Sequence, residues 1–246
     1  MPRKAQAESV ADADAAPGGA AAVDRALSLL AAFRAGDTAL SLAELATRTR
    51  LYKSTALRLL ASLEHAQLLQ RLDDGRYALG NELARLHSIY AASFSLDHVV
   101  LPELRRLVKA TGESAAYHVR QGQGADAVRL CLYRVDSPHP IRDHIRAGDV
   151  LPLNRGTGGR VLSAFDPVLA KGGSAADRKL MAGIRERGYL AANGDRLAEV
   201  AGISAPVFDG EGAIAAAVTL TMPSHRYDER YVKPVLEAAR RLSGKV

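Results

Sequence analysis

A short stretch of the chain carries side chains that could bind a polyanion. Lys53, Ser54 and Thr55 stand near the start of the segment Tyr52–His65, and Arg58 follows about one helical turn later. A lysine and hydroxyl groups can contact phosphates, and an arginine can donate two hydrogen bonds to a guanine edge. The apolar residues of the segment recur at helical spacing and would be buried; they are Ala56, Leu59, Leu60 and Leu63. On an isolated helix the same polar residues would simply be a solvated face. The flanking segments must therefore show whether this face binds a polyanion.

The segment before this helix carries the signals of a second, shorter helix. Ser41 and Glu44 have the spacing of a capping box, in which the hydroxyl and the carboxylate each accept a backbone N–H. We expect this helix to run from Leu42 to about Thr47, with a turn over Arg48–Leu51. A third amphipathic segment, Val23–Phe33, precedes both.

A tight hairpin follows the basic helix. In Leu68–Leu79, Asp74-Gly75 supplies the positive φ angles of a type I′ turn, and Arg71 and Arg76 flank its tip. A capped helix, a basic helix and a hairpin in close succession predict a winged helix-turn-helix, which lays its second helix in the major groove of DNA. The DNA contacts expected from this fold are those of Ser41, Tyr52, Lys53, Ser54, Thr55, Arg58, Arg71 and Arg76.

Bulk charge does not strengthen this prediction. The chain of 246 residues has a formal net charge of +6, yet residues 1–80 hold ten basic and nine acidic side chains. The excess lies in residues 81–246. DNA binding must therefore depend on where the charges stand rather than on their sum.

Several further features bound the class of protein. The single cysteine, Cys131, excludes an internal disulfide and suits a reducing cytoplasm. The apolar runs are far shorter than the ~20 residues of a membrane helix. Residues 1–22 are rich in Ala, Asp, Gly and Pro and lack an apolar core, which predicts a disordered tail and no secretory signal.

Beyond residue 96 the pattern changes to a helix and alternating strands. In Ala213–Met222 the larger apolar residues share one face, and small residues with Thr219 and Thr221 share the other. Residues 127–135 alternate similarly, with Arg129, Cys131 and Tyr133 on one side, and Ser114–Arg120 has a face that carries Tyr117. Together they predict an antiparallel sheet packed on one face and partly open on the other, in an α+β sensor domain.

A helix is expected between the two regions, over Asn81 to about Ala92. It could transmit a ligand-linked tilt to the DNA-binding end, or it could be a plain connection. The sequence thus divides into a tail (1–22), a winged helix-turn-helix (23–80), a linker helix (81–95) and an effector-binding and oligomerisation domain (96–246).

Three pieces of the first region carry a family resemblance. VDRALSLLAAF, SLAELATRTRLYKSTALRLLASLE and GRYALG resemble the DNA-binding domain of the IclR family of transcriptional regulators, and the resemblance covers nearly everything from Val23 onward. Arg50 and Gln67 stand where members usually carry glycine. If the backbone there is left-handed, each residue costs about 1–2 kcal/mol; alternatively, the turns have relaxed. Tyr52 replaces a usual proline, and its ring could stack on a sugar or simply pack.

The second region resembles the GAF/PAS-like effector-binding domain of the same family. Leu151–Phe165 and Arg185–Asp209 resemble the walls of the family's pocket, and the glycine-rich turn at the start of the expected helix would offer free amides to a carboxylate. The resemblance implies a pocket made by Thr157, Gly158, Gly159, Asp195, Gly202, Ser204, Thr219 and Thr221. The strand faces add Tyr117, Cys131 and Tyr133. Gly202 stands where relatives often carry a larger residue and should enlarge the cavity, which makes an aromatic or larger acid plausible.

The resemblance implies a cytoplasmic transcriptional regulator, either repressor or activator, of a catabolic operon. Its expected partners are double-stranded operator DNA, a small carboxylate effector and itself, as a homodimer or a dimer of dimers; no membrane partner is expected. No catalytic group, cofactor or metal site is predicted, because no triad-like or metal-ligating spacing is present. Two alternatives stay open: an enzyme domain joined to a winged-helix interaction module, and a ligand-independent DNA-binding protein. Cys131 is either a redox thiol or a small buried apolar residue.

Overall fold

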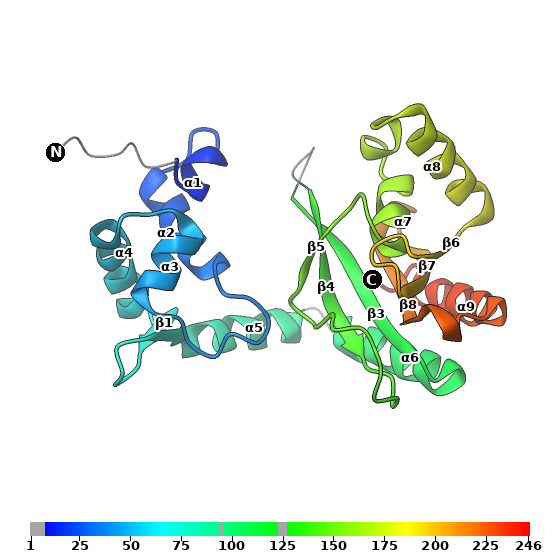
Figure 1. Cartoon of the computed structure of the whole chain (residues 1–246), viewed down its shortest axis with the longest axis horizontal. Helices are drawn as coiled ribbons and strands as arrows, with labels where there is room; N and C mark the ends of the chain where they lie inside the picture. The colour runs from blue at the N-terminus through cyan, green and yellow to red at the C-terminus, as the bar shows by residue number, and fades with distance from the viewer. Residues whose placement is uncertain (1–7, 94–95, 123–126) are drawn as a thin grey trace. The chain divides into compact units, whose positions relative to one another are not determined.

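The computed structural model of the protein describes residues 8–93, 96–122 and 127–246. The chain divides into two compact units, Met1–Phe94 and Ser95–Val246. Figure 1 shows that the first is helical with a small hairpin and that the second is built on a curved sheet. In the described ranges no helix is long and apolar enough to cross a membrane.

The first unit packs its helices and its hairpin around one apolar core. Its elements are α1 (Val10–Ala13), α2 (Ala21–Ala31), α3 (Leu42–Thr49), α4 (Lys53–His65), β1 (Leu69–Arg71), β2 (Tyr77–Leu79) and α5 (Asn81–Ser93). Leu29, Leu45, Leu60 and Tyr77 come from four different elements and are buried together. Leu40 pairs with Tyr77 and so ties the segment before α3 to the hairpin. This arrangement confirms the predicted winged helix-turn-helix. The predicted type I′ turn of the hairpin is wrong, because only Gly75 has a positive φ angle, of 81°, and Asp74 does not; the Gly75 N–H donates instead to the Leu72 carbonyl at 2.9 Å.

Local signals place α3 where the sequence predicts it. The Ser41 hydroxyl accepts the Glu44 N–H at 3.2 Å, and the Glu44 carboxylate accepts the Ser41 N–H at 2.8 Å, which completes the capping box. The helix continues two residues past the predicted end, to Thr49, whose buried hydroxyl donates to the Leu45 carbonyl.

Arg50 and Gln67 both adopt the left-handed conformation, with φ angles of 57° and 56°. Among the described residues they are the only non-glycine residues with positive φ. Arg50 ends α3, and Gln67 follows α4 with its N–H donating to the Glu64 carbonyl at 2.9 Å. The two turns have therefore kept a conformation that glycine adopts without penalty.

The prediction of a disordered tail over residues 1–22 is wrong at Val10–Ala13, which form α1, and at its end, where α2 begins at Ala21. Ser9 caps α1 by accepting the Asp12 N–H at 3.2 Å, and Asp12 forms an ion pair with Arg25 of α2 at 2.8 Å. Ser9 and Asp12 repeat the spacing of a capping box, a signal that the Ala-rich and Gly-rich composition concealed. Residues 1–7 lie outside the described residues.

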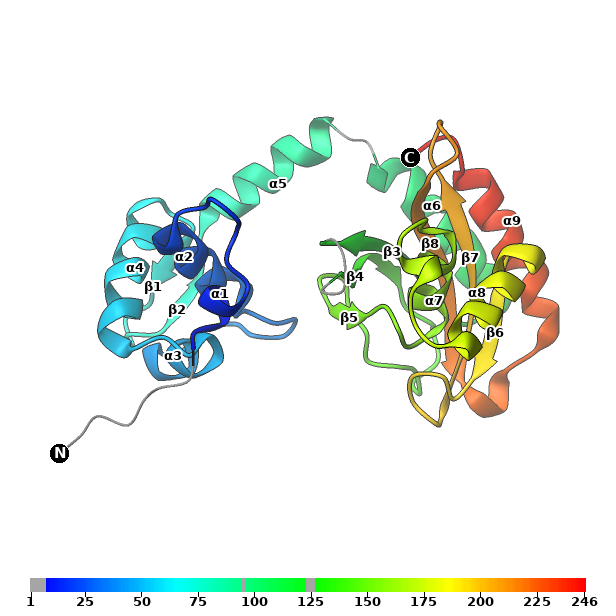
Figure 2. The ribbon, with the colours of Figure 1, turned by 90° about the horizontal axis from the view of Figure 1, so that it is seen from above.

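The second unit is built on an antiparallel sheet with strand order β5-β4-β3-β8-β7-β6. The strands are β3 (Ser114–Gln121), β4 (Val128–Val135), β5 (Val150–Pro152), β6 (Leu190–Asn193), β7 (Val200–Phe208) and β8 (Ile214–Pro223). The main helices are α6 (Leu96–Thr111), α7 (Thr157–Phe165), α8 (Ala175–Arg187) and α9 (Val232–Leu242). As Figure 2 shows, α6 and α9 cover one face of the sheet, and α7 covers the other with α8 packed beside it.

Strand β8 shows how the alternating pattern builds the two faces. Val218, Leu220 and Met222 are buried in the core beneath α6 and α9. Thr219 and Thr221 point to the α7 side, where they line a cavity. The predicted α+β unit with an antiparallel sheet is confirmed. The expectation that its second face is partly open is wrong, because α7 covers that face and a second apolar cluster, which includes Val161, Leu162 and Ala217, packs there beside the cavity.

Candidate functional site

The face of α4 opposite its buried residues is open. Lys53, Ser54 and Arg58 are exposed and Thr55 is half-buried, whereas the inward face consists of Ala56, Leu60 and Leu63. Tyr52 precedes the helix, is 57% exposed, and gives the first turn no side-chain cap. Uncapped amides at a helix N-terminus attract anions such as a phosphate.

The wing, which is the hairpin of β1 and β2, holds its two arginines in different ways. The Asp74 carboxylate accepts the Arg76 N–H at 3.0 Å and its Nε–H at 2.7 Å, and these bonds lower the pKa of Asp74. Arg76 is therefore already paired at the tip. Arg71 lies 5.9 Å from the centre of the Tyr77 ring and is exposed. The Ser41 hydroxyl donates to Glu44 at 2.7 Å and so is engaged in the capping box.

A cavity of about 20 Å³ lies on the α7 face of the sheet. A water molecule needs about 10–15 Å³ of such space, so the cavity admits only a very small group as it stands. Its lining comprises Arg129, Ile145, Gly156, Thr157, Ala192, Asp195, Arg196, Val200, Ala201, Gly202, Thr219 and Thr221.

Four buried side chains form a hydrogen-bonded chain along one wall of the cavity. Thr157 Oγ1 lies 2.7 Å from Ser204 Oγ, and Ser204 donates to Thr219 at 2.9 Å. Thr219 Oγ1 in turn lies 3.2 Å from His118 Nδ1. Burial, and then the nearby Arg129, lowers the pKa of His118 well below its ordinary value, so the ring is neutral. Its Nε2 atom has no hydrogen-bond partner in the described part of the chain.

Among the described residues, Arg129 is a buried cation that forms no ion pair. It is 2% exposed, and its Nε and Nη2 atoms find no hydrogen-bond partner among the described residues. Burial lowers the pKa of Arg129 to about 10, which still leaves the guanidinium protonated at neutral pH. A Cβ on Gly158 would stand 2.7 Å from Nη1 of Arg129. Glycine therefore lets the guanidinium lie against the N-terminus of α7, whose dipole is also positive there.

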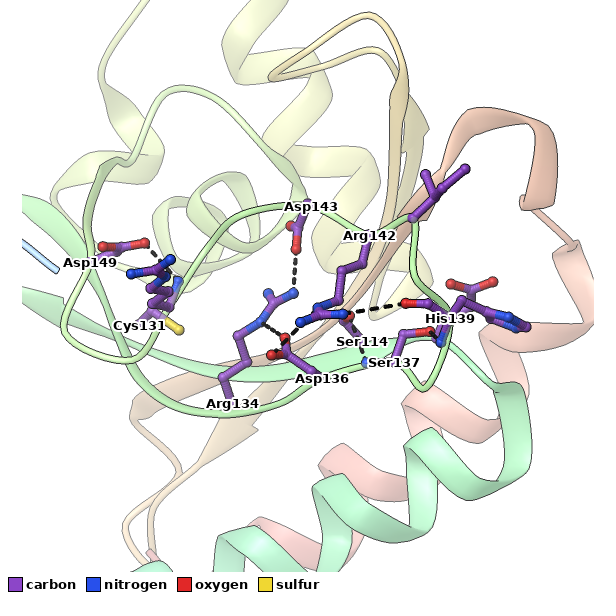
Figure 3. Close-up of polar contacts among 12 residues, drawn as sticks. Ser114, Cys131, Arg134, Asp136, Ser137, His139, Arg142, Asp143 and Asp149 are labelled. Atoms are coloured by element: carbon purple, nitrogen blue, oxygen red, sulfur yellow. Dashed lines mark hydrogen bonds and ion pairs between the residues drawn. The ribbon is translucent and has the colours of Figure 1, made fainter. Parts of the chain in front are cut away.

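A second charged cluster lies close to the cavity. Arg134 and Asp143 form an ion pair whose side chains are 4% and 1% exposed, and Arg196 lies 3.7 Å from the same carboxylate. Figure 3 shows Arg134 reaching both Asp143 and the more exposed Asp136. Arg196 lines the cavity, so this cluster brings a second guanidinium to it.

Asp195 acts as a clamp on the cavity wall. Its carboxylate accepts the Gly156 N–H at 2.6 Å and the Arg160 Nε–H at 2.8 Å. The residue was predicted to approach a ligand, and it does line the cavity. Its oxygens, however, hold the loop after β6 to the start of α7.

The structure gathers most of the predicted pocket residues. Thr157, Asp195, Gly202, Thr219 and Thr221 line the cavity. Ser204 lies behind them in the hydroxyl chain, and Gly158 packs against Arg129. Gly159 serves packing instead, because a Cβ there would stand 2.5 Å from the Leu153 carbonyl oxygen.

The expectation that Gly202 enlarges the cavity is wrong. A Cβ at this position would stand 2.7 Å from Thr157 Oγ1. The space left by the missing side chain is therefore occupied by the Thr157 hydroxyl.

The assignment of Tyr117 and Tyr133 to the pocket face is also wrong. Both belong to the core beneath α6 and α9, with ring centroids 6.2 Å apart. A β-bulge pairs Tyr117 with Tyr133 and His118 with Cys131, so strict alternation from Cys131 to Tyr133 fails. For Tyr117, alternation defined two faces of the strand without showing which of them packs beneath α6 and α9 and which lies on the cavity side.

Cys131 lies on the cavity side of β4 but does not line the cavity. It is buried with Ala116 and Ile145, and burial raises the pKa of its thiol to about 12. Such a thiol is unreactive, which favours the interpretation of a small buried apolar residue. Within the described ranges no group of His, Cys, Asp or Glu could hold a metal ion.

Several charged or polar residues around the cavity had no predicted role, namely His118, Arg134, Asp143 and Arg196. Arg129 was placed on the correct face without a role. The sequence did carry a signal for two of them, since Arg129 and Arg134 are charged residues within an otherwise apolar strand pattern. Burying a charge costs free energy unless the charge is paired, so such residues indicate a site. Arg142 and Arg146, in the loop between β4 and β5, are exposed.

Comparison with known proteins places both units in one family. The IclR helix-turn-helix domain matches residues 22–73, and the bacterial transcriptional regulator IclR C-terminal domain matches residues 176–246. The glycerol operon regulatory protein of Streptomyces coelicolor is 30% identical over 234 residues, covering 88% of this chain and 91% of the relative. The transcriptional regulator BhcR of Paracoccus denitrificans is 30% identical over 249 residues, covering 92% and 87%.

Solved structures show the same architecture. An IclR homologue from Microbacterium hydrocarbonoxydans, crystallised with 4-hydroxybenzoate, matches with a TM-score of 0.77 and 26% identity, covering 90% of this chain and 97% of the homologue. An IclR regulator from Alicyclobacillus acidocaldarius matches with a TM-score of 0.78 and 22% identity, covering 92% and 97%, and is similar in fold.

Proposed function

The chain belongs to the IclR family of bacterial transcriptional regulators, and from this we propose that it switches a catabolic operon in response to a small carboxylate. We propose that α4 and the wing bind operator DNA and that the cavity beside α7 binds the acid. The observation that carries the ligand proposal is Arg129, a buried guanidinium without a carboxylate partner in the described residues.

The surroundings of Arg129 favour an anion. An unpaired buried charge is costly, and an opposite charge in contact with it removes much of that cost. Arg196 and the N-terminus of α7 add positive potential at the same cavity. The Thr221 hydroxyl, which has no hydrogen-bond partner among the described residues, offers a further polar contact. A carboxylate satisfies this set of donors better than a neutral ligand.

The size of the cavity favours a short-chain acid. A dry cavity that holds benzene measures about 150 Å³, against about 20 Å³ here. The Microbacterium homologue was crystallised with 4-hydroxybenzoate, which supports a carboxylate as the ligand class. For this chain, an aromatic acid requires the lining residues to move far apart, whereas a short-chain acid requires a smaller displacement of the lining.

We propose that the protein acts in the cytoplasm as a homodimer or a dimer of dimers. Paired recognition helices read half-sites about one DNA turn apart. Helix α5 exposes Leu86, Ile89 and Tyr90, an apolar group that supports self-association. The ligand changes operator affinity only by binding one arrangement of the paired units more tightly than another.

The DNA proposal is tested with an operator selected from randomised duplexes. Arg58→Ala is expected to weaken binding to that operator by about 5- to 150-fold, the range for losing a base contact of about 1–3 kcal/mol. Arg34→Ala removes an exposed arginine from the loop after α2 and serves as the matched control. Unchanged affinity of Arg58→Ala in a gel-shift titration contradicts the proposed role of α4, and failure to enrich any duplex contradicts DNA binding itself.

The ligand proposal is tested by calorimetry and thermal shift with acetate, lactate and 4-hydroxybenzoate. Arg129→Gln is expected to abolish binding, and Arg142→Gln, at an exposed arginine, is expected to preserve it. If none of the acids binds the wild-type protein, the ligand-independent alternative is favoured. Undiminished binding by Arg129→Gln would place the ligand elsewhere.

A further inference from the structure

We propose that the preferred acid carries a hydroxyl group next to its carboxylate, and that Thr157 selects it by accepting a hydrogen bond from that hydroxyl. The inference rests on the proposed function, since it concerns the same cavity. It predicts that a 2-hydroxy acid binds more tightly than the 2-keto acid of the same carbon skeleton.

The hydrogen bonds between the buried hydroxyls run in one direction, from Thr157 through Ser204 to Thr219. Each hydroxyl has a single hydrogen to donate, and Ser204 donates its hydrogen to Thr219 at 2.9 Å. In the 2.7 Å contact between Thr157 and Ser204, the donor must therefore be Thr157. No hydrogen is left on Thr157 Oγ1 for a ligand, so only its lone pairs remain available to the cavity.

The neighbouring residues hold this oxygen in place. Thr157 is 4% exposed, and its Oγ1 occupies the space that a side chain at residue 202 would take. Because Thr157 is also the first residue of α7, its acceptor oxygen stands beside the helix N-terminus that attracts the carboxylate. The two recognition elements are thus adjacent.

This adjacency distinguishes a hydroxyl from a carbonyl. A hydroxyl next to the carboxylate can donate to Thr157 Oγ1, whereas a keto oxygen would place one acceptor against another. A buried acceptor that faces another acceptor loses its hydrogen bond and keeps its desolvation cost. A site built to pair with a ligand hydroxyl rejects an analogue that lacks it.

An ammonium group is the other donor that a small acid could carry next to its carboxylate. Arg129 and Arg196 line the same cavity, and like charges at short range in a desolvated site repel strongly. The hydroxyl is uncharged and avoids this repulsion. The cavity therefore selects against 2-amino acids as well as 2-keto acids.

The test compares acids that differ only at the second carbon. Lactate is matched with pyruvate and alanine, and 2-hydroxybutyrate is matched with 2-oxobutyrate, in calorimetric titrations of the full chain. The hydroxy acid is expected to bind at least about tenfold more tightly within each set. Thr157→Val keeps the shape and removes the acceptor, so this preference is expected to disappear. Thr38→Val, at an exposed threonine of the first unit, is expected to keep it.

Ser204→Ala gives the opposite expectation. Without Ser204, the Thr157 hydrogen is released and can be donated to a keto oxygen, so the preference is expected to move toward pyruvate. This variant also tests the inference if Thr157→Val does not fold.

Equal or tighter binding of pyruvate by the wild-type protein overturns the inference, as does a preference that Thr157→Val and Ser204→Ala both leave unchanged. In either case binding that still depends on Arg129 leaves the proposed function standing. Absence of binding by every acid overturns both.

Discussion

Gly202 and Thr157 meet across the cavity so closely that a Cβ on residue 202 would stand 2.7 Å from Thr157 Oγ1. The Thr157 hydroxyl on α7 can therefore take this position only because residue 202 on β7 is glycine. Gly202 thereby also allows the hydrogen-bonded chain that runs from Thr157 to Ser204 and Thr219. Because residue 202 has no side chain, the Thr157 hydroxyl can occupy that space in the site.

Replacing this glycine is expected to destabilise the second unit. Gly202→Ala forces Thr157 away from Ser204, and overpacking together with the broken hydrogen bond costs about 1–3 kcal/mol. Urea denaturation measures the free energy of unfolding. Gly210→Ala, where an added Cβ meets nothing within 4 Å, is the control and is expected to be neutral. Equal effects of the two substitutions would contradict the close contact.

Replacing the unpaired buried cation is expected to stabilise the ligand-free protein. Arg129→Met keeps an unbranched apolar stem and removes a charge that lacks a counter-ion in the described residues, so we expect a gain of about 1–3 kcal/mol. Arg142→Met, at an exposed position, is expected to change little. A large loss of stability in Arg129→Met would mean that the guanidinium already has a compensating partner.

The two left-handed turns of the first unit offer a gain of stability by substitution to glycine. Arg50→Gly and Gln67→Gly, at φ angles of 57° and 56°, are each expected to stabilise by about 1 kcal/mol, since glycine adopts this conformation without a steric penalty. Ala61→Gly, at an exposed position inside α4, is expected to destabilise by about 1 kcal/mol. Thermal and urea unfolding would show effects of opposite sign, and destabilisation by Gln67→Gly would contradict the turn geometry.

Cys131 is expected to make stability depend on pH in alkaline solution. Burial raises the pKa of its thiol from 9.0 to about 12. Above pH 9 the unfolded chain loses a proton that the folded chain retains, so this contribution to stability falls as the pH rises from about 9 toward 12. Urea titrations at increasing pH measure the slope, and Cys131→Ala should remove that part of it. The same slope in both proteins would contradict the shift.

A thiol reagent provides an independent measurement of the same residue. At pH 8 the native protein is expected to react slowly, and the unfolded protein rapidly, because only the thiolate is the nucleophile. Rapid reaction of the native protein would show that Cys131 is accessible.

Much of the first unit could be predicted from the sequence because its signals are local. The capping box of Ser41 and Glu44, the helical spacing within α4 and the position of the hairpin turn at Asp74-Gly75 each depend on residues a few positions apart. The type of that turn was not predicted correctly, because Asp74 does not adopt a positive φ angle. The conformation of Arg50 and Gln67 could not be decided in this way, because each turn had two physically acceptable outcomes. In the tail, the Ala-rich and Gly-rich composition led to a prediction of disorder, although Ser9 and Asp12 form a helix cap that is an equally local signal.

The sequence by itself determined the order of elements, the winged helix-turn-helix and the two-faced character of the strands, because periodicity and capping act between near neighbours. Only the tertiary structure decided which strand face holds the cavity and that Arg129 stands there with no ion-pair partner in the part of the chain that the structure describes. The β-bulge between Tyr117 and His118 reverses the faces of the residues that follow on β4, and Thr157, Ser204 and His118 come from three separate elements. Such contacts depend on how distant segments pack, and no local pattern in the chain encodes them.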